Sequence, residues 1–251
     1  MTEAVENARL ILSDLQFQEN NLDGLAQALK ISVIVPTLNE EVAIGQVLMD
    51  IPRDIVDEVI VVDGSTDATA KIAKSLGARI VLEWRRGYGR ALQTGIDKSV
   101  GDVLVYIDGD SSYDAKDIPR VVAPILKGEC DIVLGNRFSR GMQPGAMPFL
   151  NRIGNLALSL FFNVLFGKRV HDTQCGLRAV RKQMVEWNYC HNYGMPYVTE
   201  QLIKLIRQNA RVCSVPVAYR PRIGRTKLSP WTDGFKILEI MLRERVRRCA
   251  A

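Results

Sequence analysis

From residue 31 onwards, short apolar runs alternate with stretches of helical periodicity for about a hundred residues. Five runs read as strands: Ile31–Val35, Val59–Val62, Arg79–Leu82, Val103–Ile107 and Ile132–Leu134. The stretches between them predict helices over 39–51, 66–76, 87–99 and 115–127, with Asn39 capping the first and Gly77 following the second. This alternation predicts an α/β fold, with a mostly parallel central sheet and helices on both faces.

Carboxylates follow three of the predicted strands. They are Glu40 and Glu41, Asp63 and Asp67, and Asp108 and Asp110. Any one of them alone is typical of a turn or a helix cap. In an open α/β sheet, however, the carboxyl ends of parallel strands meet at the edge where ligands bind. Because like charges repel, three such ends at one edge favour a bound cation or a ligand that donates hydrogen bonds.

Asp108 and Asp110 are the strongest candidates for metal ligands. Side chains two residues apart on a strand share a face, and the small Gly109 leaves room for close approach. Carboxylates beside a phosphate suit Mg²⁺ or Mn²⁺. A separate segment, Gly87-Tyr88-Gly89-Arg90, precedes a predicted helix and has backbone N–H groups to offer a phosphate. It lacks the spacing of a dinucleotide fold or a P-loop.

Four segments carry a family resemblance by their order and spacing. They are Val35-Pro36-Thr37-Leu38-Asn39-Glu40, Val61-Val62-Asp63-Gly64-Ser65-Thr66-Asp67, Gly87-Tyr88-Gly89 and Asp108-Gly109-Asp110. Together they resemble family 2 glycosyltransferases of the GT-A fold, which implies a Rossmann-like half at residues 31–140 that binds a nucleotide-sugar. The resemblance implies a donor site made of Pro36, Asn39, Glu40, Asp63, Ser65, Asp67, Gly87 and Gly109. It also implies that Asp108 and Asp110 bridge the metal to the donor diphosphate.

The second half of the chain carries further motifs: Gly135-Asn136-Arg137, Gly154-Asn155, Asp172-Thr173-Gln174-Cys175-Gly176-Leu177-Arg178 and residues 219–228. They look like the polyprenyl-phosphate branch of the family, which includes the dolichyl-phosphate mannose and glucose synthases. The resemblance implies inverting transfer of a hexose from a UDP-glucose-like donor or GDP-mannose to a polyprenyl or dolichyl phosphate. The segment that begins at Asp172 is closer to the glucosyl type. Ser112 stands where mannose synthases have a metal-binding Gln, so the third metal ligand is open.

A lipid phosphate acceptor is already anionic at neutral pH, so it needs no strong general base. Catalysis then requires positive charge that brings two anionic reactants together and stabilises the departing diphosphate. The candidates are Arg137, Arg222, Arg225 and Lys227, of which Arg225 is assigned to the donor. Asp110 acts through the metal. Asp172 is expected to orient Arg178 or a sugar hydroxyl, or to cap a helix, and Gln174 to contact the donor sugar.

Positive charge is concentrated at the C-terminal end of the chain. The net charge is +5, and residues 204–251 alone carry +9. The last predicted helix, Asp233 to about Arg248, has an apolar face and a basic end, which suits either an anionic membrane surface or docking on the domain. The basic residues lack interleaved aromatic side chains, so no nucleic-acid partner is expected.

Residues 1–30 predict a helical extension, and residues 31–251 predict a single domain whose acceptor-binding half is 141–251. Five cysteines without a CxxC pair indicate reduced thiols and a cytoplasmic protein. The most apolar stretch, Leu156–Phe166, has about half of the roughly 20 residues that a membrane span needs. It predicts a buried or interfacial helix, compatible with a peripheral place on the cytoplasmic membrane face.

Two other functions stay open. One is transfer to a soluble phosphorylated acceptor such as 3-phosphoglycerate, since no membrane anchor is evident. The other is a non-catalytic scaffold that binds a nucleotide-sugar at a membrane, against which the intact Asp108 and Asp110 argue. The oligomeric state is open as well, a homo-oligomer included.

Overall fold

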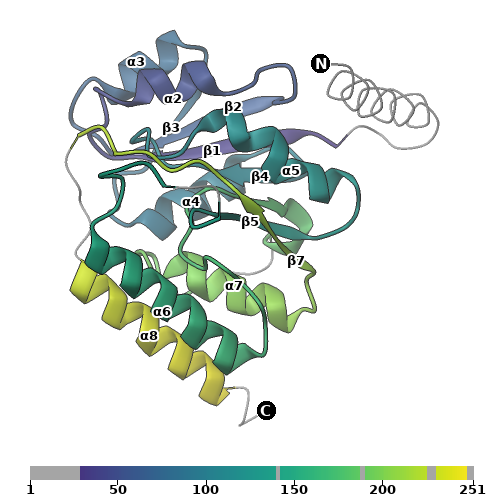
Figure 1. Cartoon of the computed structure of the whole chain (residues 1–251). Coiled ribbons are helices and arrows are strands. Elements are labelled where there is room, and N and C mark those ends of the chain that lie inside the picture. Colours follow the sequence, from purple (N-terminus) through teal and green to yellow (C-terminus); the bar gives the residue numbers. More distant parts are fainter. Residues whose placement is uncertain (1–28, 140–141, 187–189, 225–229, 248–251) are drawn as a thin grey trace, which may run out of the picture.

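The structure, a computed structural model, describes residues 29–139, 142–186, 190–224 and 230–247 of the chain. A seven-stranded sheet with the order β3-β2-β1-β4-β6-β5-β7 forms its centre (Figure 1). The strands are β1 (Ile31–Thr37), β2 (Glu58–Asp63), β3 (Arg79–Leu82), β4 (Val103–Tyr106), β5 (Ile132–Asn136), β6 (Arg178–Arg181) and β7 (Val212–Pro216). Only β6 runs antiparallel to its neighbours. The mostly parallel α/β sheet is therefore confirmed, whereas the extension predicted at 1–30 lies almost wholly outside the described residues.

Helices cover both faces of the sheet, as predicted (Figure 1). Successive side chains on a strand point to opposite faces, so Val33 and Val35 of β1 join one core and Ile34 joins the other. The first face carries α2 (Ile44–Asp50), α3 (Thr69–Ser75) and α5 (Ile118–Leu126). The second face carries α4 (Tyr88–Lys98), α6 (Phe149–Phe166), α7 (Tyr197–Arg207) and α8 (Pro230–Arg247). Single 3₁₀ turns lie at Ala115–Asp117 and Lys182–Met184.

Two helices begin later than the sequence predicts. Helix α2 starts at Ile44, and Asn39 does not cap it. Asn39 instead takes a left-handed backbone conformation (φ 52°), and its Oδ1 accepts a hydrogen bond from Thr66 N (2.8 Å). Helix α3 starts at Thr69, and Gly77 follows it with φ 78°, as predicted. The loops after β1 and β2 thus bind each other at the sheet edge instead of extending the helices.

Helix α6 is longer than the apolar stretch that predicts it. It has 18 residues, Phe149–Phe166, and by length and composition alone it could cross a membrane. The prediction that this apolar segment is too short to cross a membrane is therefore wrong. The buried side chains of α6 are Ser159, Phe162 and Phe166, and most of the others are exposed or half-buried. Helix α8 packs alongside it (Figure 1).

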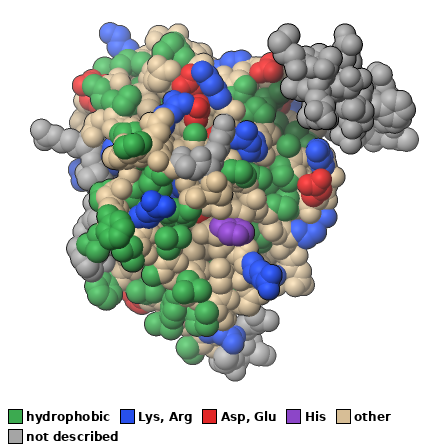
Figure 2. Space-filling view, in the orientation of Figure 1, with side chains coloured by type: hydrophobic (Ala, Val, Ile, Leu, Met, Phe, Trp, Pro, Cys, Tyr) green, Lys and Arg blue, Asp and Glu red, His purple; other side chains and the backbone are tan. Residues whose placement is uncertain are grey.

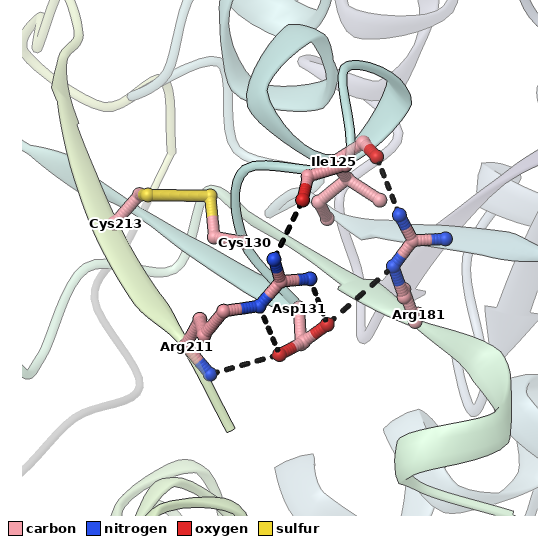
Figure 3. The surroundings of a disulfide bond; sticks show 7 residues. Ile125, Cys130, Asp131, Arg181, Arg211 and Cys213 are labelled. Atoms are coloured by element: carbon pink, nitrogen blue, oxygen red, sulfur yellow. Dashed lines mark hydrogen bonds and ion pairs between the residues drawn. A yellow bond between two sulfur atoms is a disulfide. The ribbon is translucent and has the colours of Figure 1, made fainter. Parts of the chain in front are cut away.

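A disulfide joins Cys130 and Cys213, so the prediction of five reduced thiols is wrong for this pair (Figure 3). Cys130 precedes β5 and Cys213 lies in β7, and the parallel pairing of these strands brings the two Cα atoms to 6.1 Å. The sequence hides this proximity because 83 residues separate the two positions. Cys175 and Cys190 are buried thiols, and Cys249 lies outside the described residues.

Asp131, next to the disulfide, ties together the segments around the edge strand β7. Its carboxylate accepts hydrogen bonds from Arg211 Nε (3.1 Å) and Nη2 (2.9 Å), and it lies 3.6 Å from Arg181 Nε. Arg211 also donates to the carbonyl of Gly128 (2.7 Å), and Arg181 donates to that of Ile125 (2.7 Å). These contacts and the disulfide fasten β7 to β5 and to the end of α5 (Figure 3).

Breaking the disulfide should destabilise the fold. We expect Cys213→Ser to lower the free energy of unfolding by about 2–4 kcal/mol under oxidising conditions, because the variant's unfolded chain is less constrained. Urea titration followed by circular dichroism measures this loss. With dithiothreitol present, the wild-type protein should unfold at nearly the same urea concentration as the variant. Equal midpoints for the oxidised wild type and the variant would contradict the stabilising role.

Candidate active site

A cleft of about 360 Å³ opens at the carboxyl ends of the central strands. Strand β1 pairs in parallel with both β2 and β4, so the residues that follow these strands share one edge of the sheet. The predicted site residues that line the cleft are Pro36, Glu40, Gly87, Asp108, Gly109, Asp110 and Arg222. A cleft of this size suits a small-molecule ligand.

Asp63 and its neighbours support the cleft from behind its lining. The Asp63 side chain is buried, and its Oδ1 accepts hydrogen bonds from Thr37 Oγ1 (2.7 Å) and from Ser65 Oγ. Ser65 Oγ in turn accepts a hydrogen bond from Asn39 N (2.7 Å). Asp63, Ser65 and Asn39 are not among the residues that line the cleft. Their hydrogen bonds fix the loops after β1 and β2 relative to each other.

Asp67 has a similar supporting position at the start of α3. It accepts hydrogen bonds from Thr69 N (3.0 Å) and from Glu41 N (3.3 Å). Burial raises the pKa of Asp67, but the hydrogen bonds from Thr69 and Glu41 outweigh burial and hold the pKa below its usual value. Asp67 is therefore ionised at neutral pH and engaged with the backbone, and it too is absent from the residues lining the cleft.

Asp108 and Asp110 both reach the cleft from the end of β4. Asp108 Oδ1 accepts a hydrogen bond from Tyr88 OH (2.9 Å). Burial, followed by the charge of Asp110, raises the pKa of Asp108 to about 7, and Tyr88, Arg222 and Arg137 only partly counter that effect. The negative charge of Asp110 therefore disfavours the ionised form of Asp108.

Two glycines leave room around these carboxylates. A Cβ atom on Gly109 would lie 2.8 Å from Thr37 Cγ2, and a Cβ atom on Gly176 would lie 2.7 Å from Asp108 Oδ2. The Gly176 backbone is held by its N–H, which donates to Tyr113 OH (2.7 Å). No larger residue fits at either position without displacing a neighbour.

This pair of carboxylates fits a hard divalent cation. A cation between them would offset the repulsion that raises the pKa of Asp108. Ser112, at the position of the missing third ligand, uses its backbone N–H to donate to Asp110 Oδ1 (2.9 Å). Within the described ranges, no three His, Cys, Asp or Glu side chains form a metal-binding group. The chain would thus supply two carboxylates, and a bound molecule or water would supply the other ligands.

Arg137 and Asp172 form a buried ion pair with each other. Arg137 Nε lies 2.6 Å from Asp172 Oδ2, and Nη2 lies 2.8 Å from Oδ1, while neither side chain is more than 6% exposed. The prediction that Asp172 orients Arg178 is wrong, because Arg178 donates to backbone carbonyls, including that of Cys175 (3.1 Å). The Arg137 guanidinium lies 5.2 Å from the centre of the Tyr219 ring. Tyr219 begins the basic segment 219–228, called the late basic segment below.

Arg222 brings the late basic segment into contact with the acidic strand ends. Its Nη2 lies 2.9 Å from Asp110 Oδ2 and 3.7 Å from Glu40 Oε1. Arg225 and Lys227 lie outside the described residues. Gln174 is half-buried away from the residues that line the cleft, and its Nε2 donates to Thr173 Oγ1 (2.9 Å) and Thr199 Oγ1 (3.2 Å).

Comparison with known proteins identifies the family. The sequence model of glycosyl transferase family 2 matches residues 32–189. The chain belongs to this family. A dolichyl-phosphate hexose transferase of Haloferax volcanii is 38% identical over 227 residues, which cover 86% of this chain and 96% of the relative. A dodecaprenyl-phosphate galacturonate synthase of Rhizobium johnstonii is 32% identical over 174 residues, which cover 64% of this chain and 50% of the relative.

A solved structure of a synthase shares the fold of this chain. Glucosyl-3-phosphoglycerate synthase of Mycobacterium tuberculosis, in complex with Mn²⁺, UDP and glucosyl-3-phosphoglycerate, superposes with a TM-score of 0.70 at 25% identity. The superposition covers 86% of this chain and 80% of the synthase. The predicted GT-A fold, the glycosyltransferase class and the resemblance to the polyprenyl-phosphate branch are thereby confirmed.

Two parts of the glycosyltransferase cleft are missed by the sequence reasoning. Glu83 and Arg85 follow β3 and line the cleft. Glu83 is buried and binds Arg85 through Nε (2.8 Å) and Nη2 (2.7 Å), and the hydrogen bonds from Arg85 lower the pKa of Glu83 to about 2. The sequence signal for this part is Glu83, a fourth carboxylate that follows a predicted strand, Arg79–Leu82.

The second missed part is the loop before α7, which contributes Gly194 and Met195 to the cleft. The buried carboxylate of Glu200 accepts hydrogen bonds from His191 N (2.9 Å) and Asn192 N (3.0 Å), and so holds this loop. No local sequence pattern predicts that this loop lies at the cleft, because its hydrogen bond with α4, from Arg90 N to the carbonyl of Tyr193, joins segments about a hundred residues apart in sequence.

Stability without metal should depend on the ionisation of Asp108. Because its pKa is raised to about 7 in the folded protein, the native state binds a proton that the unfolded chain has released. The free energy of unfolding should therefore fall as the pH rises from about 5 to about 8. Asp108→Asn should flatten this slope, measured by thermal unfolding in EDTA across that range. Tyr88→Phe should move the slope to higher pH, because the lost hydrogen bond favours the charged form. Parallel curves for wild type and Asp108→Asn would contradict the assignment.

Proposed function

We propose that this glycosyltransferase moves a hexose from a nucleotide-sugar to a polyprenyl phosphate, with inversion at the anomeric carbon. The observation that carries the proposal is the contact of 2.9 Å between Arg222, from the late basic segment, and Asp110, from the donor-side carboxylate pair. This contact places Arg222, the proposed phosphate-binding side chain, beside Asp110, a proposed metal ligand, in one cleft. The 38% identity with a dolichyl-phosphate hexose transferase supports the same acceptor class.

The donor occupies the cleft beside the ends of β1 and β2. Pro36 and Glu40 line the space for the base and ribose, and Gly87 lines the same cleft. Asn39, Asp63, Ser65 and Asp67 act on the donor site by fixing the two loops. Asp108 and Asp110 hold Mg²⁺ or Mn²⁺, which supplies Lewis-acid stabilisation of the departing diphosphate. The Mn²⁺ and UDP in the structural relative support this division.

The acceptor approaches from the side of the late basic segment. An anionic lipid phosphate needs no strong base, so positioning and charge neutralisation do most of the catalysis. Arg222 supplies positive charge, as do Arg225 and Lys227 in our proposal. The Arg137 guanidinium is already paired with the Asp172 carboxylate. We therefore propose that Arg137 and Asp172 support the late basic segment through Tyr219. Contact of Gln174 with the sugar stays a prediction.

An exposed apolar surface on α6 and α8 would let the enzyme reach a lipid acceptor. Figure 2 shows hydrophobic side chains gathered at the lower left, where these helices lie. Those exposed by 43% or more are Phe149, Leu150, Ile153, Leu156, Leu160 and Val164 of α6, and Phe235, Leu242 and Val246 of α8. Exposed Arg152, Lys236 and Arg243 on the same helices supply charges that suit anionic lipid. We propose peripheral binding to a membrane through this surface.

The structural relative suggests a soluble phosphorylated acceptor as the alternative. The compound bound in that structure, glucosyl-3-phosphoglycerate, has no lipid chain, but the exposed apolar surface of α6 and α8 favours a lipid acceptor. The non-catalytic scaffold is disfavoured because both metal carboxylates line the cleft. The division of labour between residues 31–140 and 141–251 stays a proposal. A cytoplasmic location also stays a proposal, because the disulfide removes the argument from reduced thiols that favoured it.

A donor and acceptor panel tests the proposed reaction. Radiolabelled UDP-hexoses and GDP-mannose are incubated with Mn²⁺ and either short-chain polyprenyl phosphate or 3-phosphoglycerate. We expect label to enter the organic phase in the lipid arm, and Asp110→Asn to reduce that transfer at least about 100-fold by removing a charge-stabilising group. Asp102→Asn, at the opposite end of β4, is the control and should retain transfer. Label transferred only to 3-phosphoglycerate would refute the lipid acceptor.

The membrane surface is tested with vesicles of phosphatidylcholine and phosphatidylglycerol. Leu160→Glu should weaken co-sedimentation at least about tenfold, because it removes roughly one buried leucine from the contact. Val100→Glu is the matched control, since Val100 is 64% exposed and Leu160 is 66% exposed, but only Leu160 belongs to α6. Equal loss in both variants, or no loss in either, would contradict the assigned surface.

A further inference from the structure

Arg222 occupies the place where two ligand-binding groups of the donor site meet. Its side chain is 26% exposed, and one nitrogen, Nη2, lies near both Asp110 Oδ2 (2.9 Å) and Glu40 Oε1 (3.7 Å). The other oxygen of Asp110 accepts a hydrogen bond from Ser112 N (2.9 Å). Arg222 therefore holds the oxygen of Asp110 that the main chain leaves for a ligand.

The backbone on either side of Arg222 is fastened, so the side chain can move by itself. Ile223 N donates to the carbonyl of Asp110 (2.9 Å), and Arg220 N donates to the carbonyl of Ser112 (2.8 Å). The side chain of Arg220 turns away from Arg222's partners and pairs with Asp114. Rotation about the side-chain bonds of Arg222 would release Asp110 without breaking either backbone hydrogen bond.

The Arg222 guanidinium also retains unused hydrogen-bonding capacity. Its Nε is buried and has no hydrogen-bond partner within the described part of the chain. A guanidinium that offers Nε–H and Nη–H together matches two oxygens of a phosphate. The contact with Asp110 thus leaves part of the hydrogen-bonding capacity of the guanidinium unused, and a phosphate would use more of it.

A divalent cation and this guanidinium would repel each other if both bound Asp110 Oδ2. Carboxylate ligands lie about 2.0–2.2 Å from Mg²⁺ or a similar hard cation, and the guanidinium lies at hydrogen-bonding distance from the same oxygen. Asp110 carries a single negative charge, which does not offset two cations held on one oxygen, so they interact unfavourably unless a further anion lies between them. In the absence of a diphosphate, the cation and Arg222 therefore exclude each other.

We propose that Arg222 and the divalent cation compete for Asp110, so that cation binding releases the Arg222 guanidinium to bind the acceptor phosphate. The inference rests on the proposed function and adds an order of events to it: the donor-side metal site is filled before the acceptor-side arginine becomes available. No bond is made or broken in this step; one cation replaces another on the same carboxylate. By linkage, a phosphate that captures Arg222 should in turn favour cation binding.

Mn²⁺ titration of the full chain, followed by the electron paramagnetic resonance signal of free Mn²⁺, tests the competition without sugar, nucleotide or acceptor. We expect Arg222→Gln to bind Mn²⁺ about five- to tenfold more tightly than wild type, at the lower end of usual coupling between sites. Arg220→Gln is the matched control, because it removes the same charge from the same segment, and its affinity should stay near that of wild type. Unchanged or weaker binding by Arg222→Gln, or an equal gain in Arg220→Gln, would overturn the proposal.

A second measurement uses the wild-type protein and so does not depend on the folding of a variant. The arginine Nε–H signals are followed by ¹⁵N nuclear magnetic resonance, with Arg222 identified by the signal that Arg222→Lys removes. Addition of Mg²⁺ should shift the signal of Arg222 and leave that of Arg220 in place, whereas an unmoved Arg222 signal would refute the exchange. Failure of hexose transfer with a positive Mn²⁺ titration would reject the proposed function and leave the competition standing.

Discussion

The parallel pairing of β1 with β2 and β4 is the constraint on which the site depends. It forces three acidic strand ends to the same edge of the sheet, where their charges would repel without compensation. The structure compensates in different ways at each end. Asp63 and Asp67 each accept hydrogen bonds both from their own loop and from β1 or the loop after it. Asp108 accepts a hydrogen bond from Tyr88, and Asp110 accepts one from Ser112 N and pairs with Arg222. The end with the weakest internal compensation is the one best suited to a cation.

Local patterns in the sequence predict the first half of the sheet and most of the cleft. The strands near residues 31, 59, 79, 103 and 132 all exist, because apolar β-branched runs bounded by turn residues have few other stable conformations. Helix starts are less predictable. Asn39 has the residue type of a cap, but its side chain finds the Thr66 backbone first, across a loop that only the folded sheet brings near.

Contacts between distant segments account for what the sequence does not reveal. The partner of Asp172 is Arg137 and not Arg178, although Arg178 is nearer in sequence. A carboxylate and a guanidinium pair wherever the fold brings them together, and sequence distance carries no information about that. The same reason hides the disulfide, which depends on β5 and β7 being neighbours. It also hides the position of the loop before α7, where the Tyr193 carbonyl accepts a hydrogen bond from Arg90 N of α4.

The position of β6 has a consequence for the order in which this molecule can assemble. Residues 178–181 insert between β4 and β5, so the two strands on either side of β6 belong to the part of the chain that is synthesised first. Until residue 181 has left the ribosome, β4 has one unpaired edge and β5, whose other neighbour β7 is synthesised later still, has two. Residues 31–140, which end before β6, are therefore not expected to fold as a separate unit. An expressed fragment that ends before β6 would also lack β7 and would expose one edge of β4 and both edges of β5, so it should be treated as prone to aggregation.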